Sequence, residues 1–144
     1  SMPWPKNVGD LKWFKENTTN NVVIMGKKTW IDPIMPAPLK NRVNILITNQ
    51  NPDLFIGADD YISGDLILKI NKISNYYSSK EKWIIGGPNI IDQTIGIIDE
   101  FYLTRIYGDH KCDTQLNIKK ILVNMKLEKK IENDDSSHFE IWKK

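Results

Sequence analysis

Cysteine and histidine are scarce in this chain of 144 residues, which has one cysteine and two histidines. Cys112 cannot form a disulfide within the chain, so a disulfide framework is excluded and a reducing compartment, the cytoplasm, is favoured. With His110 and His138 it makes no metal-ligand spacing, and we predict no metal site. Apolar runs long enough to cross a membrane are also absent, which argues against a membrane-spanning protein.

An excess of charge of one sign is missing too. Lys and Arg number 20 against 18 for Asp and Glu, giving a net charge of +2. No run of basic residues is longer than two, so neither nucleic acid nor an anionic membrane surface is indicated as a partner. Hydrophobic residues make up 40% of the chain and charged residues 26%, which is typical of a globular protein. At this length we expect one domain over residues 1–144.

Short continuous apolar runs predict strands that are buried on both faces of a sheet. Strands are expected at 22–26, 44–48, 61–62, 83–87 and 101–107. Apolar residues at helical spacing predict helices at 10–17, 27–30, 65–77 and 89–94. Ser63 is the expected N-cap of the helix over 65–77. Strands that alternate with helices favour a mostly parallel sheet that is covered on both faces.

The C-terminal region has a different pattern. Segments 125–129 and 138–142 alternate polar and apolar residues, as an antiparallel pair at a sheet edge does. Pro33, Pro36 and Pro38 mark a loop before the second strand. The predicted fold class is therefore α/β, with a mostly parallel central sheet, an antiparallel C-terminal edge pair and helices on both faces.

Paired glycines, Gly86 and Gly87, stand between a predicted strand and a predicted helix. Glycine lets the backbone approach a ligand closely, and the free N–H groups of a helix start favour an anion such as pyrophosphate. The spacing matches neither the dinucleotide fingerprint nor the P-loop. The alternative interpretation is a tight turn without a ligand.

Gly26, Lys27, Lys28 and Thr29 repeat the strand–glycine–helix pattern with two cations added. Cations at a helix N-terminus oppose the helix dipole, which suggests that they serve something negative, such as cofactor phosphates. The alternative is a solvated, charged turn.

Asp10 is the acid with the strongest chemical interest, because it precedes Leu11 and lies one turn from Phe14. An apolar surrounding raises the pKa of a carboxyl group, which can then donate or relay a proton near neutral pH. The alternative is an acid that satisfies free N–H groups at a helix N-terminus. Arg42, which follows the proline loop, is either a two-bond grip for a substrate carboxylate or a surface arginine. Trp4 is either part of a site or part of the core.

Taken in chain order, these segments resemble the dihydrofolate reductase family. The resemblance rests on Met2-Pro3-Trp4, Asp10-Leu11-Lys12-Trp13-Phe14-Lys15, Val23-Ile24-Met25-Gly26-Lys27-Lys28-Thr29-Trp30, Pro38-Leu39-Lys40-Asn41-Arg42-Val43-Asn44, Ile84-Ile85-Gly86-Gly87, Phe101-Tyr102-Leu103-Thr104 and Asp113-Thr114. The segments span nearly the whole chain in the family's order and at similar intervals, and their joint occurrence is specific.

The resemblance implies a role for each candidate residue toward the substrate. Asp10 is the active-site acid that binds the pterin amino group and ring nitrogen, Thr104 hydrogen-bonds it, and Trp4 helps to hold an ordered water. The residues expected around the rest of the substrate are Leu11 and Phe14, which pack on it, Leu39, which faces its benzoyl part, and Arg42, which grips the α-carboxylate of the glutamyl tail.

NADPH is the cofactor that the resemblance implies. Lys27 is the better candidate for its 2′-phosphate and Lys28 for another phosphate, while Thr29 lies near the nicotinamide and pyrophosphate. The other residues expected to contact it are Gly26, Thr48, Asn49, Ile85, Gly86 and Gly87, with a cis peptide bond between the paired glycines. Pro88 and Ile91 depart from the family pattern near this site, and Pro88 removes one N–H group that could face an anion.

The implied activity is reduction of 7,8-dihydrofolate to 5,6,7,8-tetrahydrofolate, by hydride transfer to C6 of the pterin with protonation at N5. Dihydrofolate and antifolates are the expected ligands of a monomer. One alternative is a catalytically impaired relative that acts as a binding or structural module. Another is a pyrimidine reductase of riboflavin synthesis, which Asp10, Phe14 and Arg42 together disfavour.

The family's first strand is the largest departure, because this sequence begins at the Pro-Trp motif. In the family that strand is central, between the strands that correspond to 83–86 and 101–107. Three explanations are open: the sequence is incomplete, a partner chain supplies the segment, or the sheet closes up in an altered, inactive form. Incompleteness is the explanation that we favour.

Overall fold

The structure is a computed structural model that describes residues 8–31, 38–50, 57–106, 118–134 and 137–144. Its elements, in chain order, are α1 (Val8–Thr18), β1 (Val22–Gly26), α2 (Lys27–Trp30), β2 (Val43–Ile47), β3 (Asp60–Ile62), α3 (Leu66–Tyr76), β4 (Lys82–Gly86), α4 (Pro88–Thr94), the 3-10 helix η2 (Ile95–Ile97), β5 (Glu100–Ile106), α5 (Ile118–Leu122), β6 (Lys126–Asp134) and β7 (Ser137–Lys143). No helix in the described ranges is both long and apolar enough to span a membrane.

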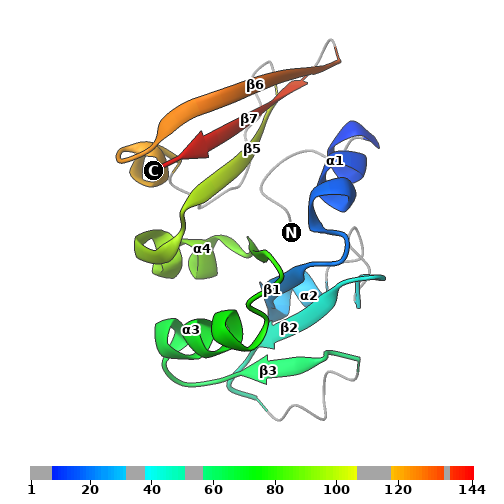
Figure 1. The fold of residues 1–144 in the computed structure, drawn as a ribbon, viewed down its shortest axis with the longest axis vertical. Coiled ribbons are helices and arrows are strands. Elements are labelled where there is room, and N and C mark those ends of the chain that lie inside the picture. Colours follow the sequence, from blue (N-terminus) through cyan, green and yellow to red (C-terminus); the bar gives the residue numbers. More distant parts are fainter. Residues whose placement is uncertain (1–7, 32–37, 51–56, 107–117, 135–136) are drawn as a thin grey trace.

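A parallel sheet of four strands, in the order β3-β2-β1-β4, forms the lower half of the molecule in Figure 1. Every neighbouring pair in it is parallel, as the sequence predicted. All five residues of β1 are buried, which explains why its sequence is a continuous apolar run.

Side chains of β1 point alternately to two apolar clusters, because successive residues of a strand face opposite sides of the sheet. Val23 and Met25 pack in a cluster that Phe14 of α1 joins. The residues on either side of Val23 face the other way, into a cluster with Ile70 and Ile73 of α3. Helices therefore cover both faces of the parallel sheet, which confirms the predicted fold class.

A second sheet of three antiparallel strands, in the order β5-β7-β6, forms the upper half of Figure 1. The predicted C-terminal pair is present as β6 and β7. The strand expected at 101–107 is present as β5, and it joins this sheet by pairing with β7 over seven residues, from Glu100 opposite Lys143 to Ile106 opposite Ser137. No described strand lies between β4 and β5, the position that the resemblance gives to the family's first strand.

Aromatic side chains connect the two sheets. The ring of Trp83 on β4 meets the ring of Tyr102 on β5 edge to face, with centroids 4.7 Å apart. The ring of Trp13 on α1 stacks on Phe139 of β7 at 4.1 Å and lies 5.5 Å from Tyr102. Trp13 is therefore a packing residue, and it fixes α1 against the antiparallel sheet.

The N-cap of α3 differs from the prediction. Ser63 was the expected cap, but Asp65 takes this position: its backbone is extended and its Oδ1 accepts a 3.0 Å hydrogen bond from the N–H of Leu68. The bond reaches the third helical residue, which is the usual geometry of an N-cap, and a carboxylate is also favoured there by the helix dipole. Ser63 lies two residues before the cap position, too far from the first turn to compete.

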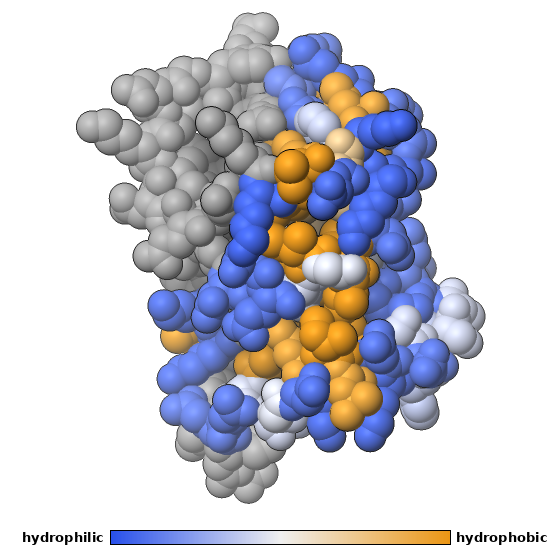
Figure 2. All heavy atoms as spheres, turned by 90° about the vertical axis from the view of Figure 1, so that its left-hand side faces the viewer, coloured by the Kyte–Doolittle hydropathy of each residue, from blue (hydrophilic) through white to orange (hydrophobic). Residues whose placement is uncertain are grey.

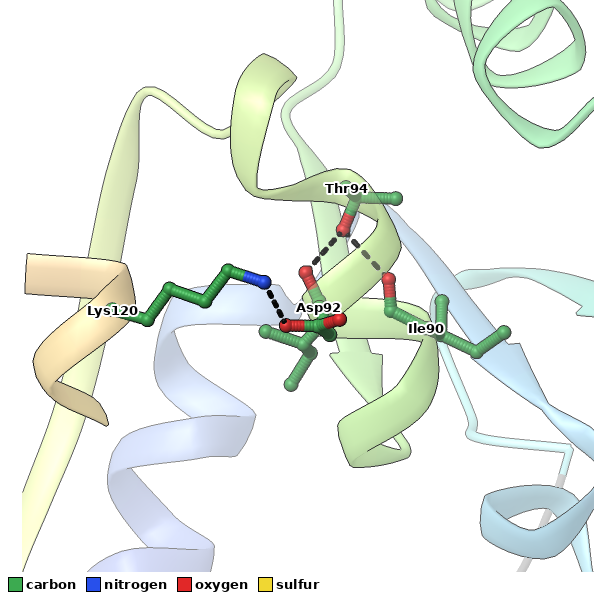
Figure 3. Close-up of polar contacts among 5 residues, drawn as sticks. Ile90, Asp92, Thr94 and Lys120 are labelled. Atoms are coloured by element: carbon green, nitrogen blue, oxygen red, sulfur yellow. Dashed lines mark hydrogen bonds and ion pairs between the residues drawn. The ribbon is translucent and has the colours of Figure 1, made fainter. Parts of the chain in front are cut away.

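Helix α4 follows the paired glycines, and its C-terminal half has hydrogen bonds within the helix and an ion pair to α5 (Figure 3). The hydroxyl of Thr94, which is fully buried, donates to the carbonyl groups of Ile90 at 2.9 Å and Ile91 at 3.1 Å. Asp92 forms a 3.0 Å ion pair with Lys120 of α5. Both residues of this pair are about half exposed, so it contributes little to stability.

Apolar side chains also reach the surface. Figure 2 shows them as a band with polar side chains on both sides, on the face that lies at the left of Figure 1. A buried cluster of Ile91, Ile121 and Met125, joined by half-buried side chains such as Ile95 and Ile98, packs α4 and η2 against α5.

Candidate functional site

The carboxyl ends of β1, β2 and β4 meet at one edge of the parallel sheet. Gly26 lies opposite Ile47, and Met25 lies opposite Gly86. The segments that leave these strands carry the predicted cofactor residues, so the structure brings Gly26, Thr29, Thr48 and Gly86 to the same edge. In open α/β sheets, ligands bind at this edge, beyond the carboxyl ends of the strands.

Glycine is favoured where β4 ends, because a side chain would be crowded and its backbone strained there. A Cβ atom on Gly86 would lie 3.1 Å from Oγ1 of Thr29, and the backbone φ of 137° is one that residues with side chains rarely adopt. A Cβ atom on Gly26 would lie 3.3 Å from the side chain of Ile90. The peptide bond between Gly86 and Gly87 is cis, as the resemblance implied.

The two glycine turns and Thr29, which is only 6% exposed, form a cradle of backbone with little side chain in it. Such a surface suits a ligand that approaches the main chain closely, so these residues fit the dinucleotide that was predicted for them. Lys27 and Lys28 are exposed on α2, directly after β1, where their charges are accessible to phosphate groups.

Thr48 and Asn49 lie directly after β2, where Asn49 also contacts the turn between β3 and α3. Oγ1 of Thr48 accepts a 3.0 Å hydrogen bond from the N–H of Gln50. Oδ1 of Asn49 accepts one of 3.3 Å from the N–H of Gly64. Ile85, the last predicted cofactor residue, is buried in the core next to the paired glycines.

Three predicted substrate residues come together on one face of the parallel sheet. Phe14 and Leu39 pack in the same apolar cluster, which also contains Ile85. The guanidinium carbon of Arg42 lies 5.9 Å from the centre of the Phe14 ring. One apolar cluster therefore joins the predicted substrate side chains to the predicted cofactor side.

Arg42 is half-buried and held in place by two hydrogen bonds. Its Nε donates to the carbonyl of Lys40 at 2.9 Å, and its Nη1 donates to Oγ1 of Thr18 at 3.1 Å. Asn41, with a φ of 60°, makes the left-handed turn that brings Arg42 back toward Lys40, and asparagine tolerates this conformation. Burial lowers the pKa of the Arg42 guanidinium from its usual value of 12.5, and an arginine stays charged in proteins.

Asn44 fastens this loop to β2, a role that the sequence analysis missed. Its Oδ1 accepts from the N–H of Leu39 at 2.8 Å, and its Nδ2 donates to the carbonyl groups of Leu39 at 2.9 Å and Arg42 at 3.0 Å. A polar residue within a predicted buried strand was the available signal, because a buried amide must find hydrogen-bond partners.

Four predicted site residues cannot be placed by their side chains. Trp4 lies outside the described residues. Asp10 and Leu11 have described backbone in α1 and Thr104 in β5, but their side chains are outside the described part. Thr104 is opposite Phe139 in the antiparallel sheet, and Phe139 stacks on Trp13, one helical turn after Asp10. The backbone of α1 near Asp10 is therefore packed on the strand next to Thr104.

The structure shows no group of three His, Cys, Asp or Glu residues that could hold a metal ion, within the residues that it describes. His110 and Cys112 lie outside these residues. His138 is buried, and its Nε2 lies 2.7 Å from Oε2 of Glu140. The other carboxylate oxygen, Oε1, accepts a 2.8 Å hydrogen bond from Nε1 of Trp142. This buried chain on β7 has a structural role in the second sheet.

Comparison with protein families gives one match that covers nearly the whole chain. The family model described as dihydrofolate reductase matches residues 1–143. The chain belongs to the dihydrofolate reductase family. This family is one of NADPH-dependent oxidoreductases, so the resemblance found in the sequence is confirmed at the level of the family.

Curated dihydrofolate reductases agree with the family match. A relative from Caenorhabditis elegans assigned to this enzyme is 32% identical over 157 residues, with 96% of this chain and 80% of that protein covered. The dihydrofolate reductase of Buchnera aphidicola from Schizaphis graminum is 38% identical over 111 residues, with 76% of this chain covered. The chain spans about three fifths of that protein's length, 60%, and 58% of a viral dihydrofolate reductase.

A solved structure has the same fold. Dihydrofolate reductase from Enterococcus faecalis, complexed with NADP(H) and RAB-propyl, superposes with a TM-score of 0.74 at 24% sequence identity. The alignment covers 99% of this chain and 84% of that protein. The dihydrofolate reductase fold is therefore shared over nearly the whole of this chain.

Proposed function

We propose that this chain catalyses the NADPH-dependent reduction of 7,8-dihydrofolate to 5,6,7,8-tetrahydrofolate. The observation that carries the proposal is the single apolar cluster in which Phe14 and Leu39, the candidates for substrate contact, pack with Ile85 beside the paired glycines. Because side chains assigned to both ligands meet in this cluster, the assignment places the two ligands close together, which is the requirement for a transfer between them.

When bound, NADPH supplies the hydride that the pterin receives. The cradle made by Gly26, Thr29 and Gly86 is the part of the chain that we assign to holding it, with Gly87 at the start of α4. Lys27 is assigned to the 2′-phosphate and Lys28 to another phosphate, since both charges are exposed beside the cradle. Thr48 and Asn49 are assigned to the adenosine end, and Ile85 to the wall between cofactor and core.

Asp10 is the acid that we assign to the pterin. Its carboxylate binds the amino group and a ring nitrogen, and it favours protonation of N5 through an ordered water that Trp4 helps to hold. Thr104 is assigned a hydrogen bond to Asp10. The packing of Trp13 on Phe139, opposite Thr104, supports this assignment because it brings α1 against the strand beside β5.

The remaining substrate contacts are assigned to one group of side chains. Leu11 and Phe14 pack on the substrate, and Leu39 faces the benzoyl part. Arg42 grips the α-carboxylate of the glutamyl tail, because its hydrogen bonds to other described residues use two of its five N–H donors and leave others for an anion. Antifolates that present a similar flat, amino-substituted ring are expected to compete for the site.

A single cysteine agrees with action in a reducing compartment, and we propose the cytoplasm.

The test is NADPH oxidation on addition of dihydrofolate, followed by the loss of NADPH absorbance. We expect turnover by the natural chain and a fall in kcat of about 10²-fold or more in Asp10→Asn, because proton transfer contributes about 10² to 10⁴ in rate. Asp99→Asn, which removes an exposed acid between η2 and β5, is the matched control and is expected to keep full turnover.

Two outcomes contradict the proposal. Equal turnover by Asp10→Asn and the natural chain rejects the role of the acid. Absence of dihydrofolate reduction by a chain that still binds NADPH rejects the proposed activity. The alternative of a binding module would then remain, although no observation on the described residues favours it.

A further inference from the structure

Thr18, the last residue of α1, makes two hydrogen bonds of opposite direction with its hydroxyl group. The hydroxyl donates to the carbonyl of Phe14 at 2.8 Å, one helical turn earlier. It accepts from Nη1 of Arg42 at 3.1 Å. A guanidinium can only donate, so the direction of the two hydrogen bonds is fixed: Arg42 donates to Thr18, and Thr18 donates to the carbonyl of Phe14.

The position of Thr18 makes this arrangement consequential. The side chain is 0% exposed, so water does not replace a lost partner there. Its two partners, Phe14 and Arg42, are also in contact with each other, since the guanidinium lies over the Phe14 ring. One hydroxyl therefore sets the relation between the aromatic ring and the cation at the end of α1.

Helix stability alone does not explain a threonine at this position. A hydroxyl that bonds back to the preceding turn is neutral or slightly unfavourable for a helix. Thr19, the next residue, makes the same kind of bond to the carbonyl of Lys15 at 2.6 Å, on the exposed side. Thr94 makes it in α4. What distinguishes Thr18 is the charged donor on its other side.

The second hydrogen bond of Arg42 comes from its own loop, so Thr18 is the partner that holds the guanidinium from another element. Nε is held by the carbonyl of Lys40 at 2.9 Å, two residues earlier in the same loop. That hydrogen bond holds one edge of the guanidinium but does not prevent rotation about the bonds of the long arginine side chain. The bond to Thr18 comes from a different element and limits the plane, which leaves the donors on Nη2 in one fixed direction.

We propose that Thr18 is a positioning residue, which orients the guanidinium of Arg42 so that its open donors face a carboxylate bound at the end of α1. This inference rests on the proposed function, in which that carboxylate belongs to the glutamyl tail of dihydrofolate. Thr18 then contributes to the preference for ligands that carry the tail and has no part in the chemistry at the pterin.

The first experiment compares two substrates in three variants. Thr18→Val removes the hydroxyl at nearly constant volume, Thr18→Ser keeps it, and Thr19→Val is the matched control for loss of a back-bond at the same helix end. The substrates are dihydrofolate and 6-methyl-7,8-dihydropterin, which lacks the benzoylglutamyl tail. We expect Thr18→Val to raise KM for dihydrofolate roughly tenfold, a change typical of one hydrogen bond to a charged group, with kcat unchanged.

The other variants sharpen this expectation. The tail-free pterin is expected to keep its KM in Thr18→Val, and Thr18→Ser and Thr19→Val are expected to behave as the natural chain with both substrates. An unchanged KM for dihydrofolate in Thr18→Val overturns the proposal. An equal rise in KM for both substrates also overturns it, because it indicates a general structural role.

A second measurement does not depend on any ligand. The chain has only two arginines, Arg42 and Arg105, so ¹⁵N signals of the guanidinium groups can be assigned with Arg105→Lys. We expect slow rotation of the Arg42 Nη groups in the natural chain and in Thr19→Val, and faster rotation in Thr18→Val. If the natural chain does not reduce dihydrofolate, the proposed function fails, and this measurement still decides the role of Thr18. Unchanged Arg42 signals in Thr18→Val reject it.

Discussion

Oγ1 of Thr29 lies 3.1 Å from the position that a Cβ atom would take on Gly86. The backbone of Gly86 also has a φ of 137°, so a side chain at this position is opposed both by a neighbouring atom and by its own backbone. Gly87 differs on both counts: its φ is −81°, and a Cβ atom would lie 3.9 Å from the same oxygen, at ordinary contact distance. The two glycines of the pair are therefore not equivalent.

Alanine substitutions are expected to separate the two glycines. Gly86→Ala should lower the free energy of unfolding by about 1–3 kcal/mol, the usual range for a residue forced into an unfavourable backbone conformation. Gly87→Ala should change it by less than about 1 kcal/mol, because its backbone accepts alanine. Urea unfolding of both variants is the measurement. Equal effects at the two positions contradict the argument.

Asn44 is expected to be important for stability. It is 2% exposed and its side chain makes three hydrogen bonds to the backbone of Leu39 and Arg42. Asn44→Ala leaves these buried backbone groups without partners, and we expect a loss of about 3 kcal/mol in the free energy of unfolding. Asn49→Ala removes one bond from an exposed asparagine and should cost less than about 1 kcal/mol. Similar midpoints of urea unfolding for the two variants are the result that this account excludes.

The parallel half of the fold could be predicted from the sequence because its signals are local. The apolar run of β1 is buried along its whole length, and the runs of β2 and β4 pair with it in parallel. The glycine turns after β1 and β4 could also be identified, because strand, glycine and helix follow one another within a few residues. The backbone cradle around Thr29 follows from this local order and the parallel register.

The remainder depends on partners that are distant in the chain. The pairing of β5 with β7 joins Glu100 to Lys143, and nothing in the residues of β5 marks it as antiparallel. The bond between Arg42 and Thr18 joins residues 24 positions apart, and threonine at a helix end is too common to indicate a partner. The predicted N-cap of α3 was wrong because the sequence pattern included residue 65 in the helix, whereas the helix begins at Leu66 and Asp65 is its cap.

The contact between Trp83 and Tyr102 is expected to couple the two sheets energetically. The rings meet edge to face at 4.7 Å, and such pairs contribute about 0.5–1.5 kcal/mol beyond the area that they bury. A double-mutant cycle with Trp83→Leu and Tyr102→Leu should give a coupling free energy in this range. The matched control is Tyr76 with Tyr77, which have the same separation of 4.7 Å, but Tyr76 is 79% exposed. A coupling free energy for Tyr76 and Tyr77 as large as that for Trp83 and Tyr102 argues against a stabilising contribution from the buried ring contact between the sheets.

Tyr102 is also expected to make stability fall at high pH. Burial raises the pKa of its phenol above the ordinary value of 10.0, and the nearby charges of Glu100 and Glu81 raise it further. Between pH 10 and the folded-state pKa, the unfolded chain has released the proton and the folded chain still holds it. The unfolded state therefore binds fewer protons, and the free energy of unfolding decreases as pH rises through this window.

Tyr102→Phe is expected to make this decline shallower, because phenylalanine keeps the ring contact with Trp83 and has no proton to release. Burial also raises the pKa of Tyr77, so part of the decline should remain in Tyr102→Phe and be reduced again in the double variant with Tyr77→Phe. Urea unfolding at a series of pH values from neutral to above 10 measures the slopes, and tyrosinate absorbance reports the titration directly. A slope above pH 10 that is identical in Tyr102→Phe and the natural chain means that the phenol titrates alike in the folded and unfolded states, and that its burial has no influence on stability.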